Sequence, residues 1–256
     1  FAYEGIKNAS PTENSFGANA GIIIGDNAVL VVDTLVSAKH ARHFINDIKK
    51  ITDKPVKYVV NTHFHLDHAW GNSEFAKHGA LIIAQENIRP NLKQLEYFMA
   101  HPDAYKFPAG FLDGTVFKAP DIYFSDKMLI DLGGITVEMK YPGPSHNSSS
   151  ITVYAVEDKT LFAGDILFIG YHPYLGEGDI ANWIKVIDML TEPGEIKIIP
   201  GHGPLAVSRD LSDMKTYLAR FDKLATELCK GKKAEDSAKI TEELLKKLPS
   251  QGRNEL

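Results

Sequence analysis

The feature that most constrains this sequence is a run of four potential metal ligands within six residues, directly after an apolar strand. Residues 56–61 are predicted to form a buried strand, and His63, His65, Asp67 and His68 follow it. Alternate side chains of an extended chain point the same way, so His63, His65 and Asp67 should share one side, and His68 should turn in where the backbone bends. Imidazole suits zinc, and a carboxylate adds charge neutralisation. The strand is therefore expected to end at a metal site.

Three further candidate ligands lie downstream, each after or beside a predicted strand. They are His146 in Pro144-Ser145-His146, Asp165 in Ala163-Gly164-Asp165, and His202 in Pro200-Gly201-His202. Glycine or proline next to each one permits the tight turns that a crowded centre requires. Taken singly, each would usually be an ordinary core or surface residue. Together with the first cluster, they indicate a site for two metal ions.

The order of apolar runs predicts an α/β protein in which two similar halves pack sheet against sheet, a four-layer αββα sandwich with helices outside. In each half, strands come first, then a helix, then a strand with a metal-type motif at its end. Strands are expected at 20–24, 29–33, 56–61, 81–84, 128–131, 135–140, 151–156, 160–163 and 196–199. Helices are expected at 37–51, with Ser37 as the N-cap, and at 72–78, 86–100 and 180–190.

Residues 1–210 are expected to form this core, and residues 211–256 a C-terminal tail of two helices, separated near Gly231, that packs on it. The regular pattern breaks at 102–124, where prolines punctuate a segment rich in tyrosine and phenylalanine. Long irregular loops in compact domains are disproportionately functional. We therefore expect this aromatic loop to form a lid over the site, with packing against the domain as the alternative.

Composition excludes several classes of protein. The net charge is -5 and no basic stripe is present, so no nucleic-acid partner is expected. No apolar run approaches the roughly 20 residues of a transmembrane helix. Cys229 is the single cysteine, which rules out an intramolecular disulfide and a thiolate metal site. The chain begins at Phe1, not at a methionine. This leaves export to the periplasm and a cytoplasmic location both open, and the oligomeric state is also open.

These motifs resemble those of the metallo-β-lactamase superfamily, in order and context, from about residue 19 to residue 205. The resemblance implies an αββα hydrolase fold and two zinc ions, with iron or manganese as alternatives. It implies that His63, His65 and His146 bind one metal, that Asp67, His68 and His202 bind the other, and that Asp165 bridges them. Asp33, in Val31-Val32-Asp33-Thr34, resembles the family's aspartate that supports the ligands from behind.

The expected reaction follows from such a metal pair. Two cations sharing a water make hydroxide available near neutral pH, and it attacks a carbonyl of a small-molecule substrate. Asp67 is the candidate catalytic residue, because a ligand with a free oxygen can orient the nucleophile and carry a proton to the leaving group.

Departures from the β-lactamase pattern favour a glyoxalase II-like thioesterase or a lactonase. Asp165 stands where the class B β-lactamases have a cysteine, and Phe168 stands where they have a lysine that binds the substrate carboxylate. The tail lacks a convincing glutathione-binding pattern. Residues 168–179 resemble a branch of exported zinc hydrolases associated with quinoproteins. The candidate substrate-pocket residues are Tyr171, His172, Tyr174 and Phe111.

Three alternatives remain beside this interpretation. A β-lactamase, weak or primary, is one. A mononuclear iron oxygenase of the persulfide dioxygenase kind, held by two histidines and an aspartate, is the second; it would leave His68 and His202 without a role as ligands. A non-catalytic metal-binding protein is the third. Metal analysis separates them, as two zinc ions, one iron or no stable metal.

Overall fold

The computed structural model of the protein describes residues 1–3, 17–101, 107–191 and 196–248. Its first half is built on a six-stranded sheet of order β1-β2-β3-β4-β5-β6. The strands are β1 (Ala2–Tyr3), β2 (Ala20–Ile24), β3 (Val29–Val32), β4 (Val56–Val60), β5 (Leu81–Gln85) and β6 (Ile122–Phe124). Strands β3 to β6 run parallel, so their carboxyl ends meet at one edge of the sheet.

The second half is built on a five-stranded sheet of order β11-β10-β9-β8-β7. The strands are β7 (Lys127–Asp131), β8 (Thr136–Lys140), β9 (Thr152–Ala155), β10 (Thr160–Phe168) and β11 (Lys197–His202). β7 to β10 pair antiparallel, whereas β10 and β11 pair in parallel. The β10–β11 register shifts on both sides of Gly164, so the ladder is irregular just before Asp165.

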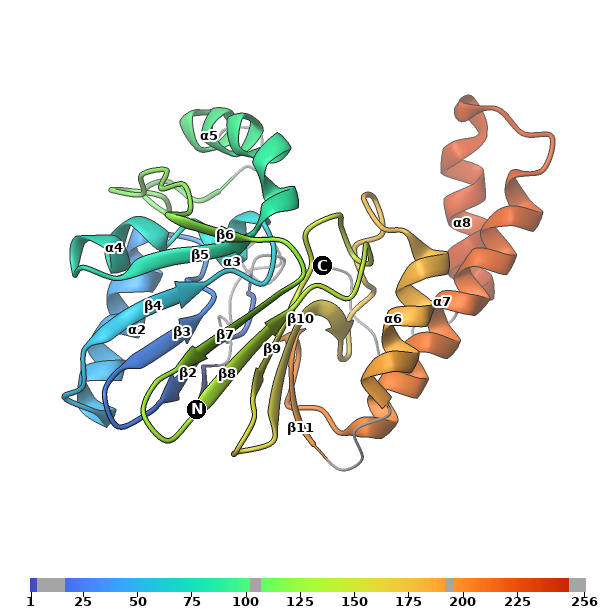
Figure 1. The fold of residues 1–256 in the computed structure, drawn as a ribbon. Coiled ribbons are helices and arrows are strands. Elements are labelled where there is room, and N and C mark those ends of the chain that lie inside the picture. Colours follow the sequence, from blue (N-terminus) through green and yellow to red (C-terminus); the bar gives the residue numbers. More distant parts are fainter. Residues whose placement is uncertain (4–16, 102–106, 192–195, 249–256) are drawn as a thin grey trace.

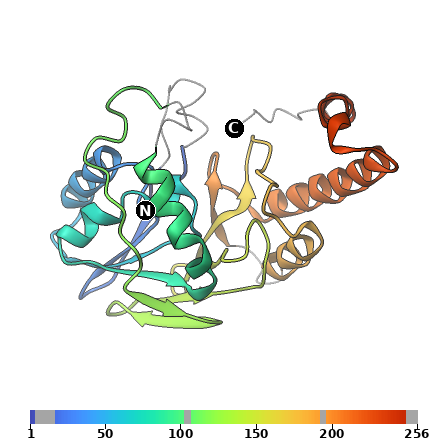
Figure 2. The ribbon, with the colours of Figure 1, turned by 90° about the horizontal axis from the view of Figure 1, so that it is seen from above.

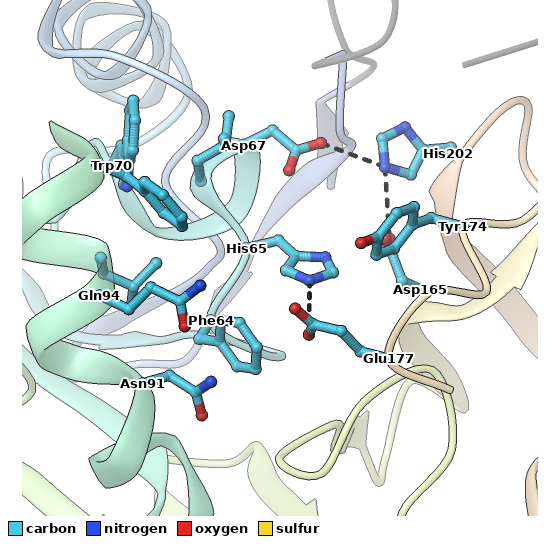
Figure 3. A pocket seen from close by; sticks show the side chains of 13 residues that line it. Phe64, His65, Asp67, Trp70, Asn91, Gln94, Asp165, Tyr174, Glu177 and His202 are labelled. Atoms are coloured by element: carbon cyan, nitrogen blue, oxygen red, sulfur yellow. Dashed lines mark hydrogen bonds and ion pairs between the residues drawn. The ribbon is translucent and has the colours of Figure 1, made fainter. Parts of the chain in front are cut away.

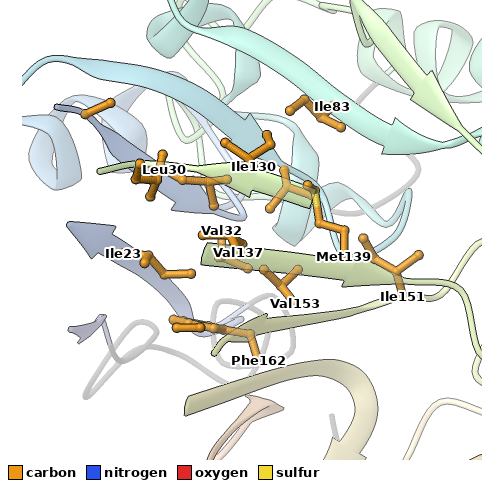
Figure 4. Packing of buried hydrophobic residues seen from close by; sticks show 14 of the residues in the cluster. Ile23, Leu30, Val32, Ile83, Ile130, Val137, Met139, Ile151, Val153 and Phe162 are labelled. Carbon is orange, nitrogen blue, oxygen red and sulfur yellow. The ribbon is translucent and has the colours of Figure 1, made fainter. Parts of the chain in front are cut away.

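The two sheets pack face to face and bury an apolar layer between them (Figure 4). Alternation along each strand decides which side chains enter this layer. In β3, Leu30 and Val32 point into it, while Val29 and Val31 point to the outer face and pack against helices. Both faces of β3 are therefore buried, which explains why its sequence is a continuous apolar run.

Helices cover the two outer faces (Figure 1). On the first sheet, α2 (Ala38–Ile51) and α4 (Asn72–Lys77) supply an apolar layer that includes Phe44, Ile48 and Phe75. On the second, α6 (Ile180–Thr191) and α7 (Ser208–Cys229) supply one that includes Trp183 and Met214. The predicted four-layer αββα sandwich is confirmed. Figure 2 shows α2 at one end of the molecule and α7 at the other.

The remaining elements are short or peripheral. They are α3 (Leu66–Ala69), η1 (Glu86–Asn91), α5 (Leu92–Ala100), η3 (Ala234–Asp236) and α8 (Ser237–Lys247). The predicted helix at 86–100 is split into η1 and α5, because Pro90 has no N–H to continue an α-helical ladder. β10 runs five residues beyond the predicted end at 163, and β6 lies inside the predicted loop.

The two helices predicted for the tail are α7 and α8, which contact each other. Since α7 begins at Ser208 and buries Leu211, Met214 and Leu218 against the second sheet, it belongs to the outer layer of the sandwich. The division into a core of 1–210 and a tail of 211–256 stays a prediction. Among the described helices, none combines the length and apolar character needed to cross a membrane.

Candidate metal centre

The seven predicted ligands converge at one edge of the sandwich, although they come from four separate segments. β4 ends at Val60 and leads to His63 and His65, and the single turn of α3 carries Asp67 and His68. This turn is the backbone bend that was expected to bring His68 inward. His146 lies in the loop between β8 and β9, while Asp165 lies on β10 and His202 ends β11.

The first set of donors is formed by His63, His65, His146 and Asp165, which can each offer an atom within 4.8 Å of the others. Oδ2 of Asp165 lies 3.3 Å from Nε2 of His146 and 3.6 Å from Nε2 of His63. Nδ1 of His65 lies 3.0 Å from Nε2 of His146. The four donors therefore surround one small volume.

The second set is formed by Asp67, His68 and His202, all buried. Oδ2 of Asp67 lies 3.3 Å from Nε2 of His202 and 3.8 Å from Nε2 of His68. Asp165 also faces this set, because its other oxygen, Oδ1, lies 3.1 Å from Nε2 of His68 and 3.4 Å from Nε2 of His202. One carboxylate thus stands between the two sets with one oxygen toward each.

The donors fit divalent metal ions. Nε2 of His63, Nε2 of His68 and Oδ1 of Asp165 are buried and find no hydrogen-bond partner among the described residues, and such atoms are unfavourable unless something else binds them. Zinc bound tetrahedrally at about 2.1 Å separates neighbouring ligand atoms by roughly 3.4 Å. The donor separations above, from 3.0 to 3.8 Å, scatter around that value. Imidazole and carboxylate are also the ligand types that zinc accepts.

The two sets differ in charge. Burial lowers the pKa of His146 to about 3 and that of His63 well below its usual value, so both are neutral. Burial also opposes protonation of His202, but the carboxylates of Asp165 and Asp67 outweigh it and raise the pKa to about 9. In the same way Asp165 and Asp33 raise the pKa of His68 well above its usual value, against its burial.

Asp33 supports His68 from behind. Its Oδ2 accepts a hydrogen bond from Nδ1 of His68 at 2.7 Å, and its two oxygens accept from the backbone N–H and hydroxyl of Thr62 at 2.7 and 2.8 Å. Asp33 adopts a positive φ of 60°, which is unfavourable for a residue other than glycine, so these bonds hold a strained backbone. Nδ1 of His68 therefore keeps its proton when a metal binds, and Nε2 is the nitrogen that would lose its proton and face the ion.

Two other ligands are oriented in the same way. Nδ1 of His146 donates to the backbone carbonyl of Tyr174 at 3.1 Å, because a carbonyl can only accept, and its Nε2 then faces the first set. Nε2 of His65 lies 3.2 Å from a carboxylate oxygen of Glu177, so Nδ1 is the nitrogen that faces the first set.

Strands β10 and β11 lie so close together at Gly201 that no larger residue fits there. A Cβ there would lie 1.9 Å from Oδ1 of Asp165. Gly164 has a φ of 50°, and a Cβ on it would lie 2.7 Å from the side chain of Thr62. The glycines noted in the sequence therefore make room for the Asp165 carboxylate and for its neighbours.

A cavity of about 470 Å³ opens onto both sets (Figure 3). Asp67, Asp165 and His202 form part of its lining. The walls come from the segment around α3, from η1 and α5, and from the loop between β10 and α6. They consist of Phe64, His65, Leu66, Trp70, Asn91, Gln94, Leu95, Phe98, Tyr174 and Glu177.

Of the four predicted pocket residues, Tyr174 lines this cavity, while the other three do not. Phe111 stacks on Phe107 and packs in a cluster with Trp70, behind the cavity wall. The Tyr171 ring lies 6.4 Å from the His202 ring, and Nδ1 of His172 lies 2.7 Å from the Tyr217 hydroxyl.

The predicted lid at 102–124 is not what covers the cavity in the described structure. Residues 102–106 lie outside the described part of the chain, and no residue from 107 to 124 is among those lining the cavity. Part of the cavity wall is supplied by α5, through Gln94, Leu95 and Phe98. The sequence pattern gave no sign of this. Glu177 was also missed, although it lies in the 168–179 segment already singled out.

Phe168 is fully buried and its ring lies parallel to that of His202, with centroids 5.1 Å apart. It supports the second set of donors and does not reach the cavity.

The fold, the seven converging donors and the motifs define the class of protein. A family model for the metallo-beta-lactamase superfamily matches residues 14–202, and the chain belongs to this superfamily. A metallo-beta-lactamase from Pontibacter korlensis superimposes with a TM-score of 0.63 at 22% identity, over 79% of this chain and 87% of that one. The DIM-1 metallo-beta-lactamase, exposed to ceftazidime, gives a TM-score of 0.63 at 19% identity, over 86% of this chain and 92% of that one. At these identities the likeness establishes the fold.

Two curated proteins that are similar in sequence are not named as β-lactamases. The chain is 28% identical over 149 residues to the alpha subunit of a 2,4-dinitroanisole O-demethylase from Nocardioides sp., covering 58% of this chain and 40% of the relative. It is 24% identical over 222 residues to a linear primary-alkylsulfatase from Pseudomonas sp., covering 74% of this chain and 42% of the relative. The chain thus matches about two fifths of the length of either relative.

Proposed function

We propose that this protein is a hydrolase with two metal ions, zinc in the first instance, that attacks the carbonyl of a thioester, lactone or related ester or amide. The observation that carries the proposal is the position of Asp165, whose two oxygens face separate sets of histidines at 3.1 to 3.6 Å. A site for a single ion, as in the iron oxygenase alternative, would leave the second set of buried donors without a purpose.

In this proposal the seven donor residues divide between two metal ions. His63, His65 and His146 would hold one ion and Asp67, His68 and His202 the other, with Asp165 shared between them. Two bound divalent ions supply hydroxide near neutral pH and stabilise charge that develops on the carbonyl oxygen. Asp67 lines the cavity, so its carboxylate can accept a hydrogen bond from the nucleophile and pass a proton to the leaving group.

The cavity wall supports an apolar acyl substrate. Phe64, Leu66, Trp70, Leu95 and Phe98 are apolar side chains of the wall, and Asn91 and Gln94 supply amides that can orient a polar group. No lysine or arginine is among the described lining residues. A β-lactam carboxylate would therefore find no basic side chain, which favours an ester or lactone over a β-lactam.

The relatives do not narrow the reaction further. One is named for O-demethylation of 2,4-dinitroanisole and the other for linear primary alkyl sulfates. These two relatives differ in substrate, so the proposal for the class of bond rests on the two donor sets and on the cavity wall.

The test is metal quantitation followed by a substrate panel. Protein prepared without chelator should hold about two equivalents of metal, mostly zinc, with His202→Ala losing mainly the second and His63→Ala mainly the first. Values of kcat/KM would then be compared for matched thioester, lactone and cephalosporin substrates, with the best ester expected to lead. A saturating content near one equivalent would exclude the dinuclear site, and a cephalosporin preferred by about tenfold would point to a β-lactamase.

A further inference from the structure

Glu177 places a carboxylate in the cavity wall, on the loop between β10 and α6. Its Oε2 lies 3.2 Å from Nε2 of His65, and its side chain is 38% exposed. Within the described part of the chain, its other oxygen, Oε1, has no hydrogen-bond or ion-pair partner. Figure 3 shows the carboxylate pointing into the cavity, below His65 and between Phe64 and Tyr174. One oxygen therefore orients a ligand histidine, and the other is available to a bound molecule.

The charge around Glu177 favours a cation. Asp67 and Asp165, the other acidic side chains of the lining, face the histidines of the candidate metal centre. Glu177 belongs to neither set of donors, so metal ions bound by those sets would leave its carboxylate uncoordinated, and no lysine or arginine of the described lining offsets its charge. A carboxylate in such a wall attracts a positive group and repels an anionic one.

The neighbouring side chains of Glu177 are aromatic. Phe64 and Tyr174 line the same cavity as Glu177, and their ring centroids lie 5.0 and 5.6 Å from that of His65, which Glu177 contacts. Trp70 and Phe98 line the same cavity. Aromatic faces attract cations through their quadrupoles, and they also pack well against the methyl groups of an alkylammonium ion.

We propose that the cavity binds an alkylammonium group at Glu177, and that the substrate of this enzyme is a carbonyl compound carrying such a group. The substrate part of this proposal rests on the hydrolase function proposed above. The apolar wall of α5 would hold the uncharged part of the molecule. The competing explanation is that Glu177 serves only to orient His65, and the variants below separate the two.

Binding is tested without hydrolysis, by calorimetric titration of the metal-loaded protein with benzyltrimethylammonium and, separately, with benzylsulfonate. The ammonium ion should bind more tightly than the sulfonate. Glu177→Gln keeps the side-chain volume and an oxygen that can accept from His65, and it should weaken ammonium binding about five- to tenfold. Glu96→Gln is the matched control: it removes one negative charge from an exposed position on α5 outside the lining, and should change binding by less than about twofold.

Metal content is measured for both variants. Ammonium binding that weakens in Glu177→Gln at unchanged metal content supports the proposal. The proposal is overturned if Glu177→Gln binds the ammonium ion as tightly as the wild type does, or if the wild type binds benzylsulfonate more tightly than the ammonium ion. It is also overturned if ammonium binding weakens only together with loss of metal, because Glu177 would then act through His65 alone.

Hydrolysis tests the substrate class. Phenylacetylcholine is compared with 3,3-dimethylbutyl phenylacetate, which has nearly the same shape without the charge. The choline ester should show a kcat/KM about five- to tenfold higher, and Glu177→Gln should bring the ratio close to one. A wild-type preference for the uncharged ester would refute the substrate class. If no carbonyl compound is hydrolysed while ammonium binding depends on Glu177, the hydrolase function fails and the ammonium site stands.

Discussion

Lowering the pH from about 9 to about 6 is expected to remove metal from Asp67, His68 and His202 before it removes metal from His63, His65 and His146. Ligands must be deprotonated to bind, so a proton held by the empty site competes with the ion. The two sets differ in this respect. The carboxylates of Asp165 and Asp67 hold a proton on His202, whereas burial keeps His146 neutral.

The size of the effect follows from the pKa values. With a pKa of about 9, His202 in the metal-free protein is protonated in about 99 of 100 molecules at pH 7, and displacement of this proton weakens metal binding on the order of 100-fold. Affinity should fall a further tenfold, roughly, for each pH unit below that. His68, with its pKa also raised, acts in the same direction. His146, with a pKa of about 3, adds no such penalty across this range.

The measurement is equilibrium dialysis against a zinc buffer at a series of pH values, followed by metal quantitation of the protein. Bound metal should fall from about two equivalents to about one as the pH drops, and the remaining equivalent should be lost only at lower pH. His202→Ala should hold about one equivalent throughout the upper part of the range. If both equivalents leave over the same pH interval and with the same slope, the charge difference between the two sets is refuted.

Three further predictions concern single substitutions. Asp67→Asn removes the charge that orients the nucleophile, so turnover should fall about 100-fold or more with the melting temperature nearly unchanged; full activity would disprove the assigned role. Asp33→Ala leaves Nδ1 of His68 without its acceptor, so affinity for the second metal should fall about 10- to 100-fold in a zinc titration, and unaltered loading would show that the hydrogen bond is dispensable. Phe168→Lys buries an ammonium group beside His202, so the protein should unfold several degrees earlier by calorimetry; an unchanged melting temperature would mean that the lysine escapes to solvent.

The last substitution shows where sequence comparison alone misleads. Phe168 occupies the place of a substrate-binding lysine in the β-lactamase pattern, and a lysine restored there could be expected to bind a β-lactam carboxylate. In this structure the position is fully buried under His202. Phe168→Lys is therefore a test of stability here and not a test of substrate choice.

Much of the fold could be predicted because its strands are buried on both faces. Residues such as Leu30 and Val31 pack against different layers, so strand β3 appears as an unbroken apolar run. The end of β10 could not be predicted in this way. Gly164 and Asp165 look like a turn after the strand, but β10 continues through a register shift and still pairs at Phe168 with His202. The extension pairs with β11, which lies more distant in the sequence, so no local pattern marks it.

The ligands could be predicted because each one lies in a local context that is visible in the sequence: a strand end, or glycine or proline next to a histidine or aspartate. The cavity wall could not, because it depends on how separate segments dock. Gln94 and Phe98 lie on an ordinary amphipathic helix, and only the position of α5 over the strand ends makes them part of the cavity. The aromatic residues at Phe107 and Phe111 gave a stronger local signal and proved to pack behind Trp70.

The metal donors lie at strand ends and part of the cavity wall lies on a separate helix, so the two can vary separately. Asp165 reaches both sets of donors because the β10 ladder is irregular at Gly164 and because Gly201 leaves space beside it. The sheets themselves meet these two requirements, and few substitutions at Gly164 or Gly201 would preserve them. Part of the wall is built from α5, which contributes no donor to the two sets, and another part from the loop that carries Glu177, which contacts His65 and His146. Substitutions in α5 can change which molecule is bound while the predicted metal donors stay in place, so substrate identity must be sought first in α5 and the chemistry in the strand ends.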